Sequence, residues 1–167
     1  MDIRYRPLAA TEGELLTSFL TSEPWPFHAG TTTPDRVRRK FENGDYDNEE
    51  TRVFWMVTDT EVGLIRLMDL SHDNPTTDVR VLSAHRGQGL GTHATQWMTR
   101  YLFTERPQLN RLAANVRHDN HAARWILTKC GYAEFVRYPG SWPGTDGVLH
   151  DALGYAISRA DWELRTE

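Results

Sequence analysis

The chain of 167 residues contains a single cysteine, Cys130, and no apolar run that approaches the roughly 20 residues needed to cross a bilayer. A lone cysteine excludes an internal disulfide and a structural metal site built from cysteines, which agrees with a reducing compartment. The first residues, MDIRYR, lack the apolar stretch of a signal peptide. We therefore expect a cytoplasmic protein that does not enter a membrane.

Basic residues are also in short supply. The 19 Lys and Arg residues are outnumbered by 23 Asp and Glu residues, which gives a formal net charge of −4 at pH 7. Broad nucleic-acid binding depends on a basic surface that displaces phosphate counterions, so we expect no nucleic-acid partner. The length, with 39% hydrophobic and 25% charged residues, suits one globular domain over residues 1–167.

Short elements alternate along the chain without internal repeats or low-complexity tracts. The hydrophobic patterns and turn residues predict strands over 3–8, 51–59, 61–70, 78–83, 110–116, 132–138 and 148–157. Helices are predicted over 11–20, from Pro34 to about residue 42, over 90–106 and over 119–131. Trp97 and Trp125 lie on apolar helical stripes, so we expect both in the core. About seven strands and four helices indicate a mixed α/β (α+β) fold.

Three alternating glycines, Gly87, Gly89 and Gly91, stand in "HRGQGLGTH" between a predicted strand and a predicted helix. A glycine turn before a helix exposes N–H groups and the positive end of the helix dipole, which suits phosphate. The alternative is a turn that needs glycine only for tight packing. The stretch lacks the Gly-Lys-Ser/Thr of a P-loop, and it does not fit the dinucleotide-binding pattern.

The motif Arg86-Gly87-Gln88-Gly89-Leu90-Gly91, directly after the strand "DVRVLS", resembles the pyrophosphate loop of the GCN5-related N-acetyltransferases (GNAT). A second family signature is matched by Asn120, Ala123, Gly131 and Tyr132. The resemblance covers nearly the whole chain, and the stretch "SWPGTDGVLHDALGYAISRADW" is similar to the ribosomal-protein acetyltransferase-like (RimJ/RimL-type) branch. It implies the GNAT fold, a central mixed but mostly antiparallel sheet of about seven strands with four helices on its two faces.

The resemblance also implies acetyl-CoA as co-substrate and no metal. The family's pyrophosphate site maps onto the backbone amides of Gly87, Gln88, Gly89, Leu90, Gly91 and Thr92. Arg86 would either neutralise the pyrophosphate with its side chain or contribute only its backbone. The strand that pairs with the pantetheine arm maps onto Val79, Arg80 and Val81, and a backbone N–H near Val81 would polarise the thioester carbonyl. Asn120 matches the side chain that contacts the arm.

Acetyl transfer in the family proceeds by direct attack of an unprotonated primary amine, without a covalent enzyme intermediate. Three positions that supply an acid or base in relatives are Leu127, Ala123 and Asn115 here. Asn115 replaces a glutamate base, and an amide cannot take a proton at neutral pH. Catalytic candidates are therefore Asn115 by position, Asp78 or Asp73 acting through water, and His28, whose side-chain type titrates near neutrality. The two aspartates could instead be solvated loop caps.

The acceptor site has its own candidates. By resemblance, the loop "EPWPFHAG" forms one wall of this site with Trp25, Phe27 and His28, although the two aromatics could instead fill the core. The last long turn, with Ser141, Trp142 and Asp146, would close over the acceptor. His118 and His121 lack a third ligand at suitable spacing, so we expect a solvated helix end and no metal there.

The sequence therefore predicts an acetyl-CoA-dependent N-acetyltransferase for a primary amine: a protein amino terminus, an aminoglycoside, a polyamine or an amino acid. The alternative is an acyl-CoA-binding sensor or non-catalytic module of the same fold. The sequence does not determine the oligomeric state, although a homodimer is the commonest soluble assembly.

Overall fold

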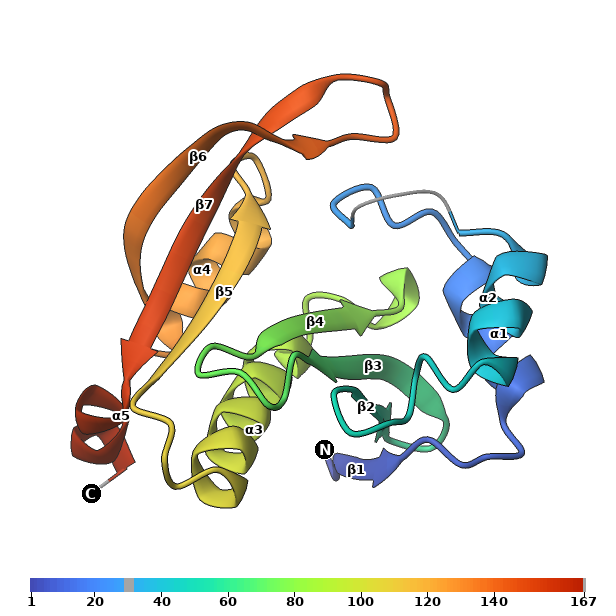
Figure 1. Ribbon diagram of the computed structural model, residues 1–167, viewed down its shortest axis with the longest axis horizontal. Helices are drawn as coiled ribbons and strands as arrows, with labels where there is room; N and C mark the ends of the chain where they lie inside the picture. The colour runs from blue at the N-terminus through green and yellow to red at the C-terminus, as the bar shows by residue number, and fades with distance from the viewer. Residues whose placement is uncertain (29–31, 167) are drawn as a thin grey trace.

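The structure is a computed structural model that describes residues 1–28 and 32–166, and these residues form seven strands and five α-helices. The strands are β1 (Arg4–Pro7), β2 (Arg52–Val57), β3 (Glu61–Met68), β4 (Thr76–Val81), β5 (Arg111–Arg117), β6 (Ala133–Pro143) and β7 (Leu149–Ser158). The helices are α1 (Gly13–Thr21), α2 (Pro34–Glu42), α3 (Leu90–Glu105), α4 (His121–Lys129) and α5 (Arg159–Thr166) (Figure 1). The mixed α/β class is confirmed, and α5 is an addition to the four predicted helices.

The strands form two antiparallel sheets, in the order β1-β2-β3-β4 and β5-β7-β6. The expectation of one central mixed sheet is corrected, because β4 and β5 are not hydrogen-bonded neighbours. Figure 1 shows the two sheets diverging between these strands. The hydrophobic pattern of each strand predicts its existence but not which of its edges finds a partner. Among the described strands, none pairs with the outer edge of β4.

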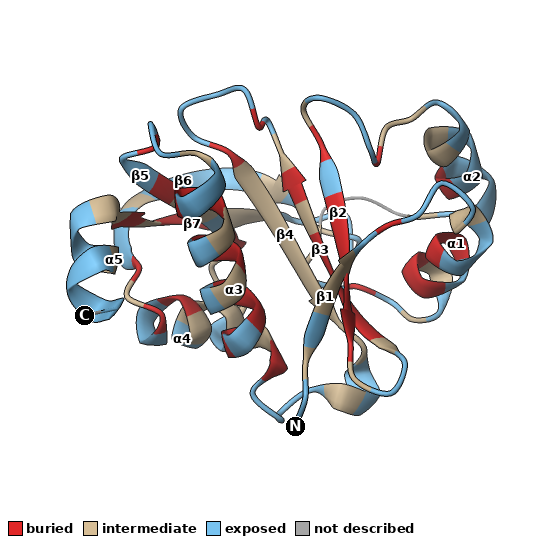
Figure 2. Cartoon of the chain, turned by 90° about the horizontal axis from the view of Figure 1, so that it is seen from below, coloured by how far each residue is buried: buried red, intermediate tan, exposed pale blue. Residues whose placement is uncertain are grey.

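Alternation along β2 produces two cores. Val53, Trp55 and Val57 face α1 and α2, and the intervening Phe54 and Met56 face the larger core that includes α3. Figure 2 shows buried residues on β2 and β3 and on the inner sides of α1 and α3. The four-stranded sheet is thus covered on both faces, which fixes the positions of β4 and of the loops at its ends.

The two tryptophans predicted on helical stripes behave differently. Trp97 of α3 is half-buried and stacks on Tyr5 at 4.3 Å between ring centroids, as expected for a core residue. Trp125 is 60% exposed, so its assignment to the core is wrong. The buried side of the short helix α4 is set by Leu127, whereas Trp125 lies at the surface with the Lys129 ammonium 4.7 Å from its ring centroid.

The strand β6 runs farther than predicted, through Pro139 and Gly140 to Pro143. Its register against β7 shifts between Tyr138 and Trp142, and such an irregularity accommodates a proline that cannot donate to the ladder. Trp142 is therefore a strand residue opposite His150, not part of the closing turn. Within residues 1–28 and 32–166, no helix is both long and apolar enough to cross a membrane.

Candidate active site

The free edge of β4 presents backbone groups toward the side where the sheets diverge. Leu82 N–H donates to the Val62 carbonyl at 3.0 Å, which directs the polar groups of every second β4 residue toward β3. Val79 and Val81 alternate with these residues, so their N–H and C=O groups point to the opposite edge. A peptide-like ligand could add to this edge as an extra strand.

The glycine loop continues from this strand into α3. Gly87 and Gly89 have φ values of +76° and +83°, which is the left-handed region that favours glycine, and a Cβ on either would enter open space. Arg86 N–H and His93 N–H donate to nearby carbonyls, but no amide of residues 87–92 donates to a described residue. Among the described residues, these six adjacent N–H groups at the start of a sixteen-residue helix have no acceptor, and amides in this arrangement suit an anion. We call this group of amides the cradle.

Gly91 has another role. A Cβ at Gly91 would lie 2.7 Å from Cδ1 of Ile126, so this glycine allows α3 and α4 to pack closely. Gly87 and Gly89 leave the open side of the loop free of side chains, whereas Gly91 leaves room for Ile126 in the core behind the loop.

Arg86 is bound to the protein rather than turned toward the cradle. Its Nε donates to the Val81 carbonyl at 2.9 Å, and its Nη2 lies 2.9 Å from Oε2 of Glu23. Glu23 also accepts from the Ser83 N–H at 2.9 Å. The Arg86 side chain therefore fastens the start of the loop to the end of β4 and to the segment after α1.

His28 and Asp78, two separate candidates in the sequence, are brought together. Nδ1 of His28 lies 2.8 Å from Oδ1 of Asp78, and the other Asp78 oxygen accepts from Nε of Arg80 at 3.0 Å. Burial raises the pKa of Asp78, but the hydrogen bond and charge of His28, with those of Arg80, outweigh it and hold this pKa well below its usual range. Asp78 is thus an ionised partner that orients the imidazole.

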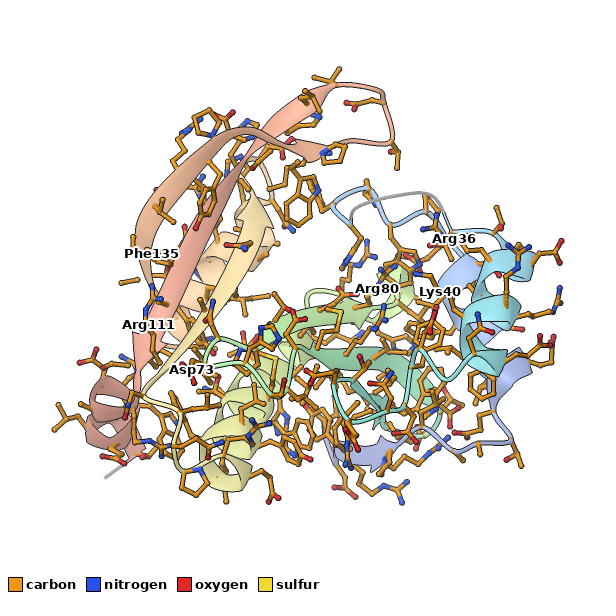
Figure 3. The ribbon with its side chains drawn as sticks, viewed as in Figure 1. Arg36, Lys40, Asp73, Arg80, Arg111 and Phe135 are labelled. Atoms are coloured by element: carbon orange, nitrogen blue, oxygen red, sulfur yellow. The ribbon has the colours of Figure 1, made fainter. Side chains whose placement is uncertain are left out.

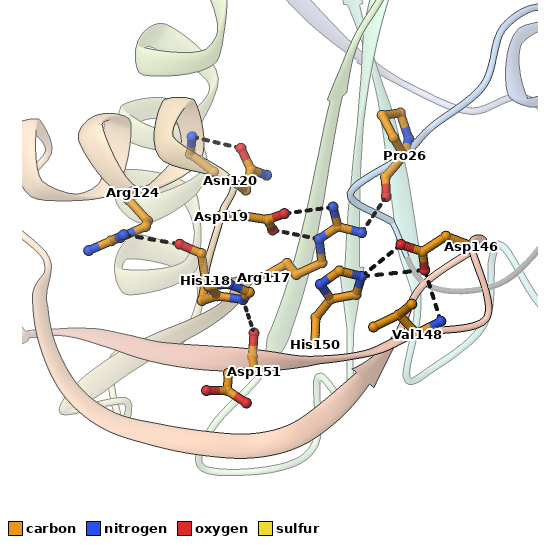
Figure 4. Close-up of polar contacts among 11 residues, drawn as sticks. Pro26, Arg117, His118, Asp119, Asn120, Arg124, Asp146, Val148, His150 and Asp151 are labelled. Carbon is orange, nitrogen blue, oxygen red and sulfur yellow. Dashed lines mark hydrogen bonds and ion pairs between the residues drawn. The ribbon is translucent and has the colours of Figure 1, made fainter.

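The segment of Trp25 to His28 spans the divergence between the sheets. It reaches β4 through the His28–Asp78 contact and β5 through Arg117, whose Nη1 donates to the Pro26 carbonyl at 3.2 Å (Figure 4). The Arg117 guanidinium also lies 4.7 Å from the Phe27 ring centroid. A bidentate contact with Asp119, at 2.6 and 2.9 Å, fixes Arg117 in this position.

Residues 2–133 match the Acetyltransferase (GNAT) domain family. The chain belongs to the GNAT acetyltransferase family. It is therefore an enzyme that transfers an acetyl group to an amine, and the family uses acetyl-CoA as co-substrate. Comparison with curated protein sequences gives no match.

Solved structures share the fold of this acetyltransferase. Mutant forms of the spermidine/spermine N-acetyltransferase SpeG from Vibrio cholerae superpose with a TM-score of 0.83 at 17% identity, covering 99% of this chain and 98% of that one. RimJ from Mycobacterium smegmatis, solved in complex with CoA-disulfide, gives a TM-score of 0.76 at 21% identity, with 95% and 83% covered. At these identities the likeness concerns the fold alone.

Other residues of the acetyltransferase predicted at the site lie as follows. Asn120 caps α4 by accepting from the Ala123 N–H at 3.1 Å. Asn115 is exposed on β5, and the alternation of that strand places it on the same face as Arg117. Asp73 is exposed in the loop between β3 and β4, and the carboxylate that pairs with His28 is that of Asp78. Leu127 is buried in the larger core.

Trp25 belongs to the core between the sheet and α1, since it is only 8% exposed and its Nε1 donates to the Leu20 carbonyl at 3.1 Å. Its ring packs edge-on against the His28 ring, with 5.8 Å between the ring centroids, and so supports the imidazole from the side of the core. Trp142 on β6 has a buried Nε1 without a partner among the described residues.

Sequence reasoning missed His150, which lies near His118 and Asp119 at the end of β5. One ligand atom from each of these three side chains lies within 4.8 Å of the others, whereas His121 is not part of the group. Each carboxylate nearby already has a partner: Asp119 binds Arg117, and Asp146 lies 3.1 Å from His150 (Figure 4). Spacing along the chain could not reveal this cluster, because β5 and β7 meet only through the sheet.

Proposed function

We propose that this acetyltransferase moves the acetyl group of acetyl-CoA to a primary amine between the free edge of β4 and the segment of Trp25 to His28. The observation that carries the proposal is the His28–Asp78 contact of 2.8 Å at the strand that also leads into the glycine loop. This contact holds His28, the proposed proton acceptor, beside the edge of β4 to which we assign acetyl-CoA.

The glycine loop fits coenzyme A. The unpaired amides of residues 87–92 and the open space beside Gly87 and Gly89 suit a pyrophosphate, and a Cβ at either glycine would occupy that space. We assign the pantetheine arm to the edge of Val79, Arg80 and Val81 and to Asn120. When bound, acetyl-CoA supplies the activated thioester. Because Arg86 is held by Glu23 and Val81, we assign it an anchoring role rather than direct charge neutralisation.

His28 takes the proton of the attacking amine in this proposal. With Nδ1 on Asp78, the Nε2 atom is left to accept a proton directly or through one water. The amine nitrogen forms a bond to the thioester carbon, the carbon–sulfur bond breaks, and the sulfur leaves as a thiolate. The low pKa of Asp78 makes it a weak base, so we assign it the positioning of His28 instead.

The acceptor would be enclosed by Phe27 and His28 on one side and by the β6–β7 hairpin with Trp142 on the other. Asn115 is available on the intervening face of β5 for a hydrogen bond to the acceptor, but not for proton transfer. Trp25 contributes by supporting His28 from the core.

Release of coenzyme A from acetyl-CoA, measured over a panel of primary amines, tests the proposal. The panel covers amino-terminal peptides, aminoglycosides, polyamines and amino acids. Amine-dependent release with an acetylated product supports the proposed function. Tight coenzyme A binding without turnover on any amine would instead support a sensor or non-catalytic module.

Two further expectations accompany this proposal. We propose a cytoplasmic location, which suits the free and buried thiol of Cys130. We also propose a homodimer, which sedimentation analysis would test.

A further inference from the structure

A second polar site lies beside the His28–Asp78 pair, on the face of the four-stranded sheet that α2 covers. It is a cavity of about 120 Å³ between α2, β3 and β4. Four cationic side chains line it, Arg36 and Lys40 from α2, Arg66 from β3 and Arg80 from β4, against one carboxylate, Asp78. Figure 3 shows Arg80 and Lys40 close together between the sheet and α2, with Arg36 above them.

The positive charge of this cavity is largely uncompensated. Asp78 pairs with Arg80 and His28, whereas Arg36, Lys40 and Arg66 form no ion pair with a described carboxylate. The Nε atom of Arg66 is buried without a hydrogen-bond partner among the described residues. Its Nη2 donates to the Asp45 carbonyl at 3.2 Å, and the guanidinium lies 4.8 Å from the Tyr46 ring centroid, so the side chain is held in place.

A buried guanidinium N–H without an acceptor is costly, and the Arg66 side chain that carries it is one of the four cations that line the cavity. An acid group in the cavity would compensate these cations with charge-assisted hydrogen bonds. The size of the cavity indicates how much of a ligand it can take. Whole small-molecule sites measure about 300–1,000 Å³, so a cavity of about 120 Å³ suits one acid group of a larger molecule. The rest of that molecule must extend out of the cavity.

Asp78 links the cavity to the proposed transfer site. One of its oxygens binds Arg80 at the cavity wall, and the other binds His28, so the two sites are separated by a single side chain. We propose that the cavity binds the acid group of the acetyl acceptor, and that the acceptor is a primary amine bearing a carboxylate or phosphate. This inference rests on the proposed function. A polyamine would bring its cations toward uncompensated cations and is the disfavoured acceptor.

The test compares acceptors that differ only in the acid group. A series of ω-amino acids of increasing chain length is assayed against the matching ω-amino amides, and aminoalkyl phosphates against the matching amino alcohols. We expect at least one acid-bearing acceptor to exceed its neutral partner in kcat/KM by about tenfold or more, the effect of a hydrogen bond to a charged group. Whichever series shows the larger ratio of kcat/KM, ω-amino acids over amides or aminoalkyl phosphates over amino alcohols, identifies the acid group as carboxylate or phosphate.

The matched variants are Lys40→Met, which removes a cavity cation, and Arg39→Met, which removes an exposed cation of the same helix outside the cavity. Lys40→Met should reduce the preference for the acid by raising KM, with coenzyme A affinity unchanged, and Arg39→Met should keep it. Inorganic phosphate should compete with the acceptor. Equal rates for acid and neutral partners, a preference that survives Lys40→Met, or phosphate binding without competition would each overturn the inference.

Different results would overturn the proposed acetyl transfer and the proposed acid-group site. Active turnover of neutral amines with no acid preference removes only the acid-group inference. If no amine is acetylated, the proposed function fails, and titration calorimetry with inorganic phosphate decides whether the cavity binds anions. Binding that Lys40→Met weakens supports an anion site, and absence of binding overturns it.

Discussion

The imidazole of His28 and the carboxylate of Asp78 meet at 2.8 Å, although one lies in the segment after α1 and the other on the strand β4. The backbone N–H of His28 also donates to the Trp25 carbonyl at 3.1 Å, so both the backbone and the side chain of His28 are held in place. The contact between His28 and Asp78 attaches the segment of Trp25 to His28 to the four-stranded sheet.

Asp78→Asn should lower the free energy of unfolding at neutral pH by about 1–3 kcal/mol, because a partly buried carboxylate loses its charge and one of the two oxygens that contact His28 and Arg80. The folded pKa of Asp78 is depressed, so its contribution is fully present above the unfolded pKa of about 3.9 and is lost progressively as pH falls from there through the lower folded pKa. Denaturant unfolding of both proteins at several pH values measures this. The difference should vanish in acid, and the exposed Asp73→Asn should show none.

Gly89→Val should greatly weaken coenzyme A binding while the protein stays folded. The added side chain enters the open space of the cradle, and the φ of +83° costs a branched residue about 1–2 kcal/mol. Titration calorimetry with coenzyme A gives the affinity. Gly44→Val, with a similar φ of +76° in the turn after α2, imposes comparable backbone strain and should leave the affinity intact. Equal affinities in the two variants would refute the assignment of the cradle.

Arg117→Met should raise KM for the amine several-fold without changing coenzyme A affinity. The substitution removes the hydrogen bond to Pro26 and the contact with the Phe27 ring, so the segment beside His28 loses its attachment to β5. Steady-state kinetics with the best amine of the panel measures it. Arg111→Met on the same strand, where the guanidinium lies over Phe135, is the control (Figure 3). An unchanged KM in Arg117→Met would exclude this wall from the acceptor site.

The sequence predicts the helices and strands well, but it predicts poorly how they pair and pack against one another. Periodicity and caps are local, so α3, the Asn120 cap of α4 and the glycine loop could be located from the chain alone. The division between β4 and β5 could not, because strand edges are paired by tertiary packing. Trp125 was misplaced because a nine-residue helix samples too few turns to define its buried side.

The same limit applies to the candidate site. The backbone cradle follows from a contiguous motif, whereas the His28–Asp78 contact and the Arg117–Phe27 contact join segments that are remote in sequence. The basic cavity gives no signal in a chain of net charge −4, because its cations come from three separate elements.

The pH profile of kcat/KM for the wild type and His28→Ala shows whether His28 accepts the proton of the attacking amine. With coenzyme A affinity and melting temperature measured alongside, the variant should lose about 10²–10⁴-fold in kcat/KM at neutral pH, as expected for a general base. The loss should shrink as pH rises, because more of the free amine is then already unprotonated. A variant that keeps wild-type activity, or whose activity falls only in step with its melting temperature, would rule out His28 as the general base.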